Sequence, residues 1–125
     1  MKDIVFSPAA PAAIGPYSQA TAVKGLVFTS GQLGMDPETG VLAEGVQAQT
    51  RRALENVKAI LSAAGVGMDQ VLKTTVFLQD MADFAAMNEV YGKYFTEDCP
   101  ARSAVEVANL PKGALVEIEV IAKQK

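Results

Sequence analysis

Arg102 is the residue whose setting most directly suggests chemistry. It opens an otherwise apolar stretch of expected strand, where a guanidinium group must find an anion or stay at a wet edge. Glu106 on the same stretch would lie about 13 Å away at the ordinary rise of a strand, so it is a poor ion-pair partner. Two parallel hydrogen bonds to the carboxylate of a small ligand would satisfy the guanidinium, although an ion pair within the protein stays open as the alternative.

Glu117 and Glu119 are the candidates for a general base. Two positions apart on a strand, their side chains lie on one face, so each carboxylate feels the charge of the other, and their apolar neighbours reduce contact with water. Both effects raise the pKa of a carboxyl group, which could then accept a proton from a nearby water molecule. Two solvated surface glutamates remain the simpler alternative.

Missing residues limit the remaining chemistry. Cys99 is the single cysteine, and the acidic side chains of Glu97 and Asp98 disfavour its thiolate, so a nucleophilic role is not expected. Without histidine, neither a Ser-His-Asp triad nor the usual zinc and iron sites can be assembled, and no metal is expected. A net charge of −3 and only three arginines leave no basic stripe for nucleic acid.

Repeating patterns predict the first elements that would position these groups. Two β-prone segments, 20–23 and 26–30, flank a turn-forming Lys-Gly pair and predict a hairpin. Apolar residues over 46–64 recur at the three-to-four spacing of an amphipathic helix, which would end at Gly65. Residues 71–78 are rich in β-branched and aromatic side chains and predict a strand.

The second half of the chain predicts one more helix and two more strands. The helix would be capped by Asp80 or Asp83 and would end before Pro100. Strands over 102–107 and 115–122, joined by a turn through Asn-Leu-Pro-Lys-Gly, would then bring the final strand next to the one that begins with Arg102.

The element order ββαβαββ predicts an α+β fold in which a mainly antiparallel sheet carries both helices on one face, within a single domain of residues 1–125. Along 115–122 one row of side chains is apolar, while the other mixes apolar residues with glutamates, so the second face of the sheet needs a cover that further subunits could provide. No apolar run reaches the length of a signal peptide core or a membrane span, which predicts a cytoplasmic protein.

Several segments resemble the Rid (reactive intermediate deaminase) family, also called YjgF-like, and the likeness runs nearly end to end. The most specific segment is PARSAVEVANLPKGALVEI, which begins at Pro100, and further similar segments are GPYSQ, TSGQ and KTTVFLQDMADF, together with Asn88. The resemblance implies a fold like that of chorismate mutase, in a homotrimer whose sheets form a central barrel with three sites between subunits. It also implies hydrolysis of reactive 2-imino acids, such as 2-iminobutanoate and 2-iminopropanoate, to 2-oxo acids and ammonia without a cofactor.

The resemblance assigns roles to seven positions, some of them contributed by a neighbouring subunit: Tyr17, Ser30, Gly31, Asn88, Arg102, Ala104 and Glu117. Arg102 would hold the substrate carboxylate, and Glu117 would orient or deprotonate the attacking water. Gly31 and Ala104 would contact the substrate through backbone groups, and the other three would line the pocket. Ala104 stands where many bacterial members carry cysteine, and activity is expected to survive because the contact there is through the backbone.

Two other functions stay open on the sequence. The protein could bind a small carboxylate, such as a 2-oxo acid, as a sensor without turnover. It could also carry the ribonuclease or translation-inhibitor activity sometimes attached to this family, against which the acidic charge and the missing histidines argue.

Overall fold

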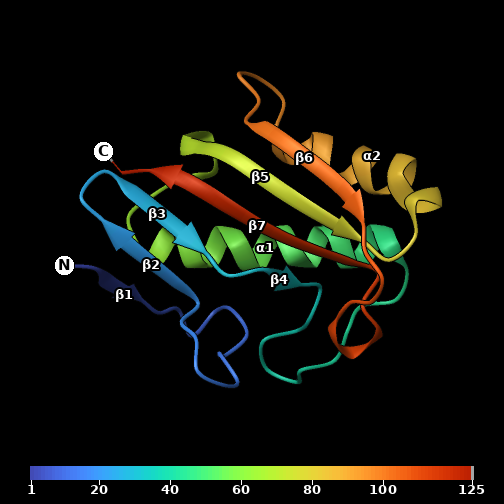
Figure 1. Ribbon diagram of the computed structural model, residues 1–125, viewed down its shortest axis with the longest axis horizontal. Coiled ribbons are helices and arrows are strands. Elements are labelled where there is room, and N and C mark those ends of the chain that lie inside the picture. Colours follow the sequence, from blue (N-terminus) through green and yellow to red (C-terminus); the bar gives the residue numbers. More distant parts are fainter. Residues whose placement is uncertain (125) are drawn as a thin grey trace.

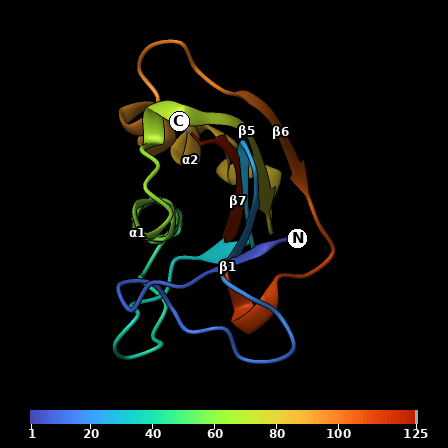
Figure 2. The same cartoon turned by 90° about the vertical axis from the view of Figure 1, so that its left-hand side faces the viewer.

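The computed structural model describes residues 1–124, which form a mixed β-sheet with two α-helices on one face (Figures 1 and 2). The helices are α1 (Val46–Ala63) and α2 (Phe84–Tyr94). The strands are β1 (Asp3–Val5), β2 (Ala20–Val23), β3 (Leu26–Thr29), β4 (Gln32–Leu33), β5 (Val71–Leu78), β6 (Ala101–Glu106) and β7 (Val116–Lys123). Short 3₁₀ helices lie at η1 (Met68–Gln70), η2 (Met81–Asp83) and η3 (Pro111–Gly113).

The sheet has the strand order β1-β2-β3-β7-β5-β6, and β4 is a further partner of β7. The expected β2–β3 hairpin is confirmed, with Val23 opposite Leu26. The expectation that the final strand adjoins β6 is wrong, because β7 lies between β3 and β5, and β6 pairs with β5 in parallel. The helix α2 explains this arrangement, since a helical crossover returns the chain in its original direction on the outer side of β5.

The core lies between the helices and the sheet. The middle of the predicted apolar stripe of α1 is fully buried in it at Ala53, Leu54, Val57, Ile60 and Leu61, whereas Val46 and Ala64 at its ends are half-buried. The helix ends as expected at a left-handed Gly65 with φ 74°, where the N–H groups of Gly65 and Val66 donate to the carbonyls of Ser62 and Leu61. On β7 the predicted apolar row is buried from Val116 to Ala122, so α1 fixes which side of this strand faces the core.

Two details depart from the expected elements. β1 and β4 were not expected, because three and two residues are too short to show an alternating pattern. Asp80 caps η2, where its carboxylate accepts a hydrogen bond of 2.9 Å from the Ala82 N–H, while α2 itself begins at Phe84 after Asp83, whose side chain makes no capping bond.

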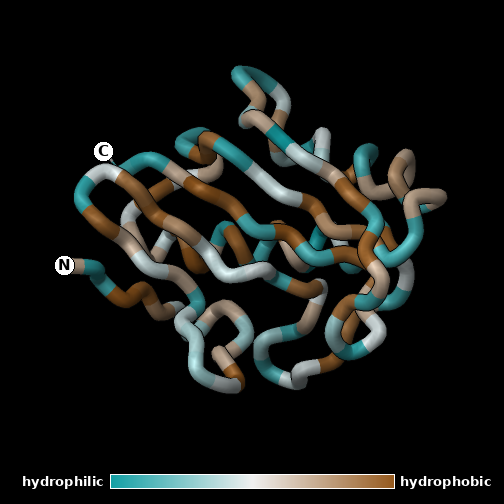
Figure 3. Tube along the Cα trace, viewed as in Figure 1, coloured by the Kyte–Doolittle hydropathy of each residue, from teal (hydrophilic) through white to brown (hydrophobic). Residues whose placement is uncertain are grey.

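The sheet face away from the helices is only partly covered. Phe28 on β3 and Val105 on β6 are 39% and 43% exposed, and Glu117, Glu119 and Ile121 of β7 alternate with the buried row. Figure 3 shows hydrophobic segments along the central strands, whereas the tip of the loop before β6 is hydrophilic. No helix within residues 1–124 is apolar over a length that could cross a membrane.

Candidate functional site

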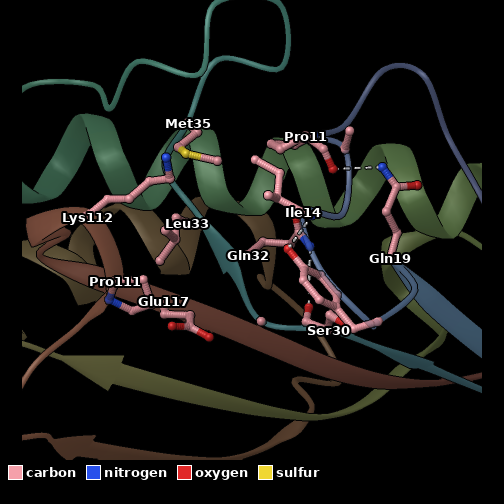
Figure 4. A pocket seen from close by; sticks show the side chains of 13 residues that line it. Pro11, Ile14, Gln19, Ser30, Gln32, Leu33, Met35, Pro111, Lys112 and Glu117 are labelled. Atoms are coloured by element: carbon pink, nitrogen blue, oxygen red, sulfur yellow. Dashed lines mark hydrogen bonds between the residues drawn. The ribbon is translucent and has the colours of Figure 1, made fainter.

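A pocket of about 500 Å³ opens on the side of β7 that carries Glu117 (Figure 4). The N-terminal loop, the segment from Ser30 to Met35 and the start of η3 form its walls. Four of the seven residues expected in the site line it: Tyr17, Ser30, Gly31 and Glu117. These four residues are called the glutamate half-site below.

Glu117 lies against Gly31 in this half-site. It pairs with Leu33 of β4 and with Phe77 of β5, which fixes the direction of its side chain. A Cβ atom added to Gly31 would come within 2.8 Å of the Glu117 carboxyl carbon, so the glycine provides the space that the carboxylate occupies. Partial burial raises the pKa of Glu117, and the negative charge of Glu119 raises it further. The carboxylate therefore holds a proton more readily than a solvated one does.

Ser30 and Tyr17 contribute to the pocket wall and are themselves held in place. The Ser30 hydroxyl donates to the Ser18 carbonyl at 2.6 Å, and its N–H donates to the Gln19 carbonyl at 2.8 Å. The Tyr17 hydroxyl accepts a hydrogen bond of 3.3 Å from the Ile14 N–H. Because the Ser30 proton is already committed, this hydroxyl is left with the ability to accept a hydrogen bond from a ligand.

Gln19 is a structural residue of this site that the sequence analysis did not identify. Its side chain is 3% exposed, and its Oε1 accepts from the Ser7 N–H at 2.6 Å. Its amide group donates to the carbonyls of Ser7, Ala10 and Pro11 at 3.0, 3.3 and 2.8 Å. One buried amide thus folds the N-terminal loop into a pocket wall. The GPYSQ motif was the available signal, since its final residue is a glutamine directly before a strand.

Arg102 lies in a cradle formed by one face of α2. Its Nη1 donates to the Asn88 Oδ1 at 2.6 Å, and its guanidinium carbon lies 4.7 Å from the ring centroid of Tyr91 and 5.3 Å from that of Phe84. These three α2 residues are spaced by four and three positions, so they share one helix face. An amide and two rings orient the guanidinium without neutralising its charge.

Two further observations bear on this cradle. The Tyr91 hydroxyl shares a hydrogen bond of 2.8 Å with Thr74 of β5, and burial is the main reason that the pKa of Tyr91 is raised. Glu106 does not pair with Arg102, because its Oε1 accepts the Met81 N–H at 2.7 Å. The sequence analysis did not identify Phe84 and Tyr91 as part of this cradle, and their spacing from Asn88 was the available signal.

The remaining expected residues lie apart from the pocket. Asn88, Arg102 and Ala104 are called the arginine half-site below. Arg102 and Ala104 lie on β6, which is an end strand of the sheet within the described chain, so part of its backbone hydrogen-bonding capacity points away from β5. Asn88 is held by Arg102 and does not line the pocket. The substrate contacts expected of these residues stay predictions.

The sheet separates the two half-sites within one chain. Arg102 pairs with Thr74 of β5 and faces α2, whereas Glu117 pairs with Phe77 of the same strand and faces away from the helices. The strand β5 therefore stands between the cation and the carboxylate, which share no cleft within residues 1–124. No pocket described here among residues 1–124 of one chain is lined by both groups.

Known proteins resemble this chain over its whole length. The model of the family described as Endoribonuclease L-PSP matches residues 7–124. A RutC family protein of Pyrococcus horikoshii is 54% identical over 98% of both chains. A protein of Salmonella typhimurium named 2-iminobutanoate/2-iminopropanoate deaminase is 51% identical over the full length of both. The solved structure of E. coli TdcF with bound serine superposes with a TM-score of 0.95 at 48% identity, covering 98% of this chain and 99% of the other.

Proposed function

Because the chain belongs to the Rid, or YjgF-like, family, whose model is described as Endoribonuclease L-PSP, we propose that it hydrolyses reactive 2-imino acids to 2-oxo acids and ammonia. The substrates would include 2-iminobutanoate and 2-iminopropanoate, as in the name of the Salmonella typhimurium relative. The observation that carries the proposal is Glu117, a partly buried carboxylate of raised pKa at one side of a ligand-sized pocket.

The complete site would form between copies of the chain, with the arginine half-site of one copy facing the glutamate half-site of another. Two features support this arrangement. The half-sites lie on opposite faces of one sheet, and the face that carries Glu117 leaves apolar side chains exposed, Phe28 among them. A homotrimer with the sheets around a central barrel would cover this face and repeat the site three times.

In the bound substrate, the carboxylate would form two parallel hydrogen bonds with Arg102, which fixes the imine carbon relative to the opposing pocket. The cradle of Phe84, Asn88 and Tyr91 would restrict the guanidinium before the substrate arrives. A restricted guanidinium loses less conformational freedom on binding, so the cradle would favour affinity as well as orientation.

Glu117 would then act on water. The substrate reacts as the imine protonated on nitrogen. The water oxygen bonds to the imine carbon while Glu117 takes one water proton, and the C=N electron pair moves to nitrogen, which gives a carbinolamine. Glu117 next returns this proton to the nitrogen, the C–N bond breaks, and ammonia leaves as the hydroxyl group becomes the carbonyl of the 2-oxo acid. The released hydroxyl proton converts ammonia to ammonium, so one water is consumed for each imine. A carboxylate with raised proton affinity suits both transfers.

The direct experiment measures 2-oxo acid release from imines that an amino-acid oxidase generates, with and without the protein. Glu117→Gln should abolish the acceleration. Glu119→Gln is the matched control, because this second carboxylate lies on the same face of β7 but does not line the pocket. Equal rates with and without the wild-type protein would remove the proposal.

The shared site has its own test. Arg102→Ala and Glu117→Gln proteins should each be inactive, but subunits mixed by co-refolding should recover about one quarter of the wild-type activity. In an equal mixture, each site has a chance of about one half of receiving an intact arginine half-site and about one half of receiving an intact glutamate half-site. Both are needed, which gives about one quarter. No recovery in a mixed oligomer would show that both groups must come from one chain.

Binding without turnover is a second candidate function, and the bound serine in the similar TdcF structure favours it. It predicts that wild-type protein binds 2-oxo acids yet leaves the imine lifetime unchanged. The endoribonuclease description of the family model suggests RNA cleavage, which the net charge of −3 and the absence of histidine do not support. We also propose that residues 1–125 act as one domain in the cytoplasm, where imino acids would be released by metabolic enzymes.

A further inference from the structure

The pocket beside Glu117 is larger than the smallest proposed substrates require. 2-Iminobutanoate has seven non-hydrogen atoms. If each takes roughly the 30 Å³ that one water molecule occupies in the liquid, the substrate needs about 200 Å³. Within one chain the pocket holds about 500 Å³, well above the volume of this substrate, and the arginine half-site of a second copy would take up part of the difference. An unfilled region in a partly enclosed site favours a longer ligand if its walls match that ligand chemically.

The walls of this additional region are largely apolar, although the side chain of Lys112 also lines the pocket. Figure 4 shows Glu117 and Ser30 near the strands, while Ile14, Pro11 and Met35 lie on the side nearer to α1. Burying a charged or hydrogen-bonding group against such a wall would cost its hydration without replacing it. Methyl and methylene groups would instead gain free energy by leaving water.

Buried amides fix both sides of this wall. Gln19 holds the N-terminal loop through the Pro11 carbonyl at 2.8 Å. On the other side, Asn56 of α1 is 1% exposed and donates to the carbonyls of Leu33 and Met35 at 3.1 and 2.9 Å. Because both tethers are buried and hydrogen-bonded, the apolar wall exists before any ligand arrives, and binding need not order it.

We propose, building on the function proposed above, that this wall is a subsite for the substrate side chain. It selects 2-imino acids whose apolar side chains have about three to four carbons over 2-iminopropanoate, whose side chain is a single methyl group. The imine carbon lies beside Glu117, and the side chain extends along Ile14, Leu33 and Met35. Each additional methylene buried there raises kcat/KM by about fourfold, so the imine derived from norleucine should exceed that derived from alanine by roughly ten- to sixtyfold.

The test compares imines generated from alanine, norvaline and norleucine in wild-type protein and in two variants. Ile14→Gln is the first variant, because Ile14 is 75% exposed and its replacement leaves the core untouched. Met35→Gln is the second and changes the opposite part of the wall. Each should lower the norleucine-to-alanine ratio of kcat/KM at least threefold. Val41→Gln is the control, because Val41 is 64% exposed and lies outside the pocket.

Affinity for 2-oxo acids, measured by calorimetry, separates this proposal from the proposed function. If no imine is hydrolysed but 2-oxohexanoate binds at least tenfold more tightly than pyruvate, and Ile14→Gln reduces this preference, the subsite stands and hydrolysis falls. If chain length changes neither kcat/KM nor affinity, or if both variants keep the wild-type ratios, the subsite is wrong whatever the protein does with imines.

Discussion

Replacing Gly31 by alanine should impair catalysis while leaving the fold intact. The new Cβ would lie 2.8 Å from the Glu117 carboxyl carbon and 2.9 Å from its Cγ, whereas ordinary contacts begin near 3.4 Å. The Glu117 Oε2 atom would lie closer still, so the carboxylate must retreat by more than about 0.6 Å or rotate away, and a displacement of about 1 Å can reduce a rate on the order of 100-fold. We expect kcat to fall about ten- to 100-fold.

The stability of the Gly31→Ala protein should change little. Gly31 does not have the left-handed backbone conformation that disfavours alanine, and the atom that must move is the end of a side chain. Alanine also reduces the freedom of the unfolded chain, which offsets part of the steric cost, so the free energy of unfolding should stay within about 1 kcal/mol of the wild type.

The assay combines steady-state imine hydrolysis with chemical denaturation of the same samples. Gly92→Ala is the matched control, because Gly92 lies on α2 with no atom within 4 Å of an added Cβ. That variant should keep wild-type kcat and gain about 0.5–1 kcal/mol from improved helix propensity. Wild-type kcat in Gly31→Ala would refute the close coupling of Gly31 and Glu117.

Four further predictions concern charge and packing around the half-sites. The pKa of Glu117 is higher in the folded chain than in the unfolded chain, so the folded state binds this proton more tightly. Stability therefore falls as the pH rises from the unfolded pKa of Glu117 through its folded pKa. Glu117→Gln should therefore be more stable than wild type at pH 7, and thermal melts should show this advantage disappearing below about pH 4. Because the charge of Glu119 contributes to the raised pKa of Glu117, Glu119→Gln should move the acidic limb of the kcat/KM profile to lower pH; an unmoved limb would show that another group controls it. Tyr91→Phe keeps a ring beside Arg102 but leaves the buried Thr74 hydroxyl without its partner. Denaturation should therefore show that the free energy of unfolding falls by about 1–2 kcal/mol, with a nearly unchanged KM. Asn88→Ala removes the hydrogen bond to Arg102 and should raise KM at constant stability.

The longest elements could be predicted because their patterns repeat. The stripe of α1 spans five turns and ends at a glycine, and the row from Val116 to Ala122 alternates over the whole of β7, so local periodicity was enough to identify both. Strand pairing was less accessible. The turn through Asn-Leu-Pro-Lys-Gly favours neighbouring strands, but the crossover through α2 leaves β6 at the outer side of β5, and β7 pairs with β3 across a long sequence separation.

The residue types of the candidate site were visible in the sequence, since an arginine in an apolar strand and paired glutamates on the final strand are unusual chemically. Their distribution over two half-sites was not. The side of the sheet that each residue faces depends on the register of β5 with both neighbours, which places Arg102 beside α2 and Glu117 on the other face. The amides of Gln19 and Asn56 were likewise undetectable as wall tethers, because the carbonyls they bind become neighbours only after folding.

The sequence by itself determined the types of the longer elements, the family and the chemical groups available, because these depend on residue identity and local spacing. Only the tertiary structure decided which groups share a pocket, which side chains surround Arg102 and how large the pocket is. Those properties arise from contacts between distant segments, whose geometry is set by packing of the whole core rather than by any local pattern.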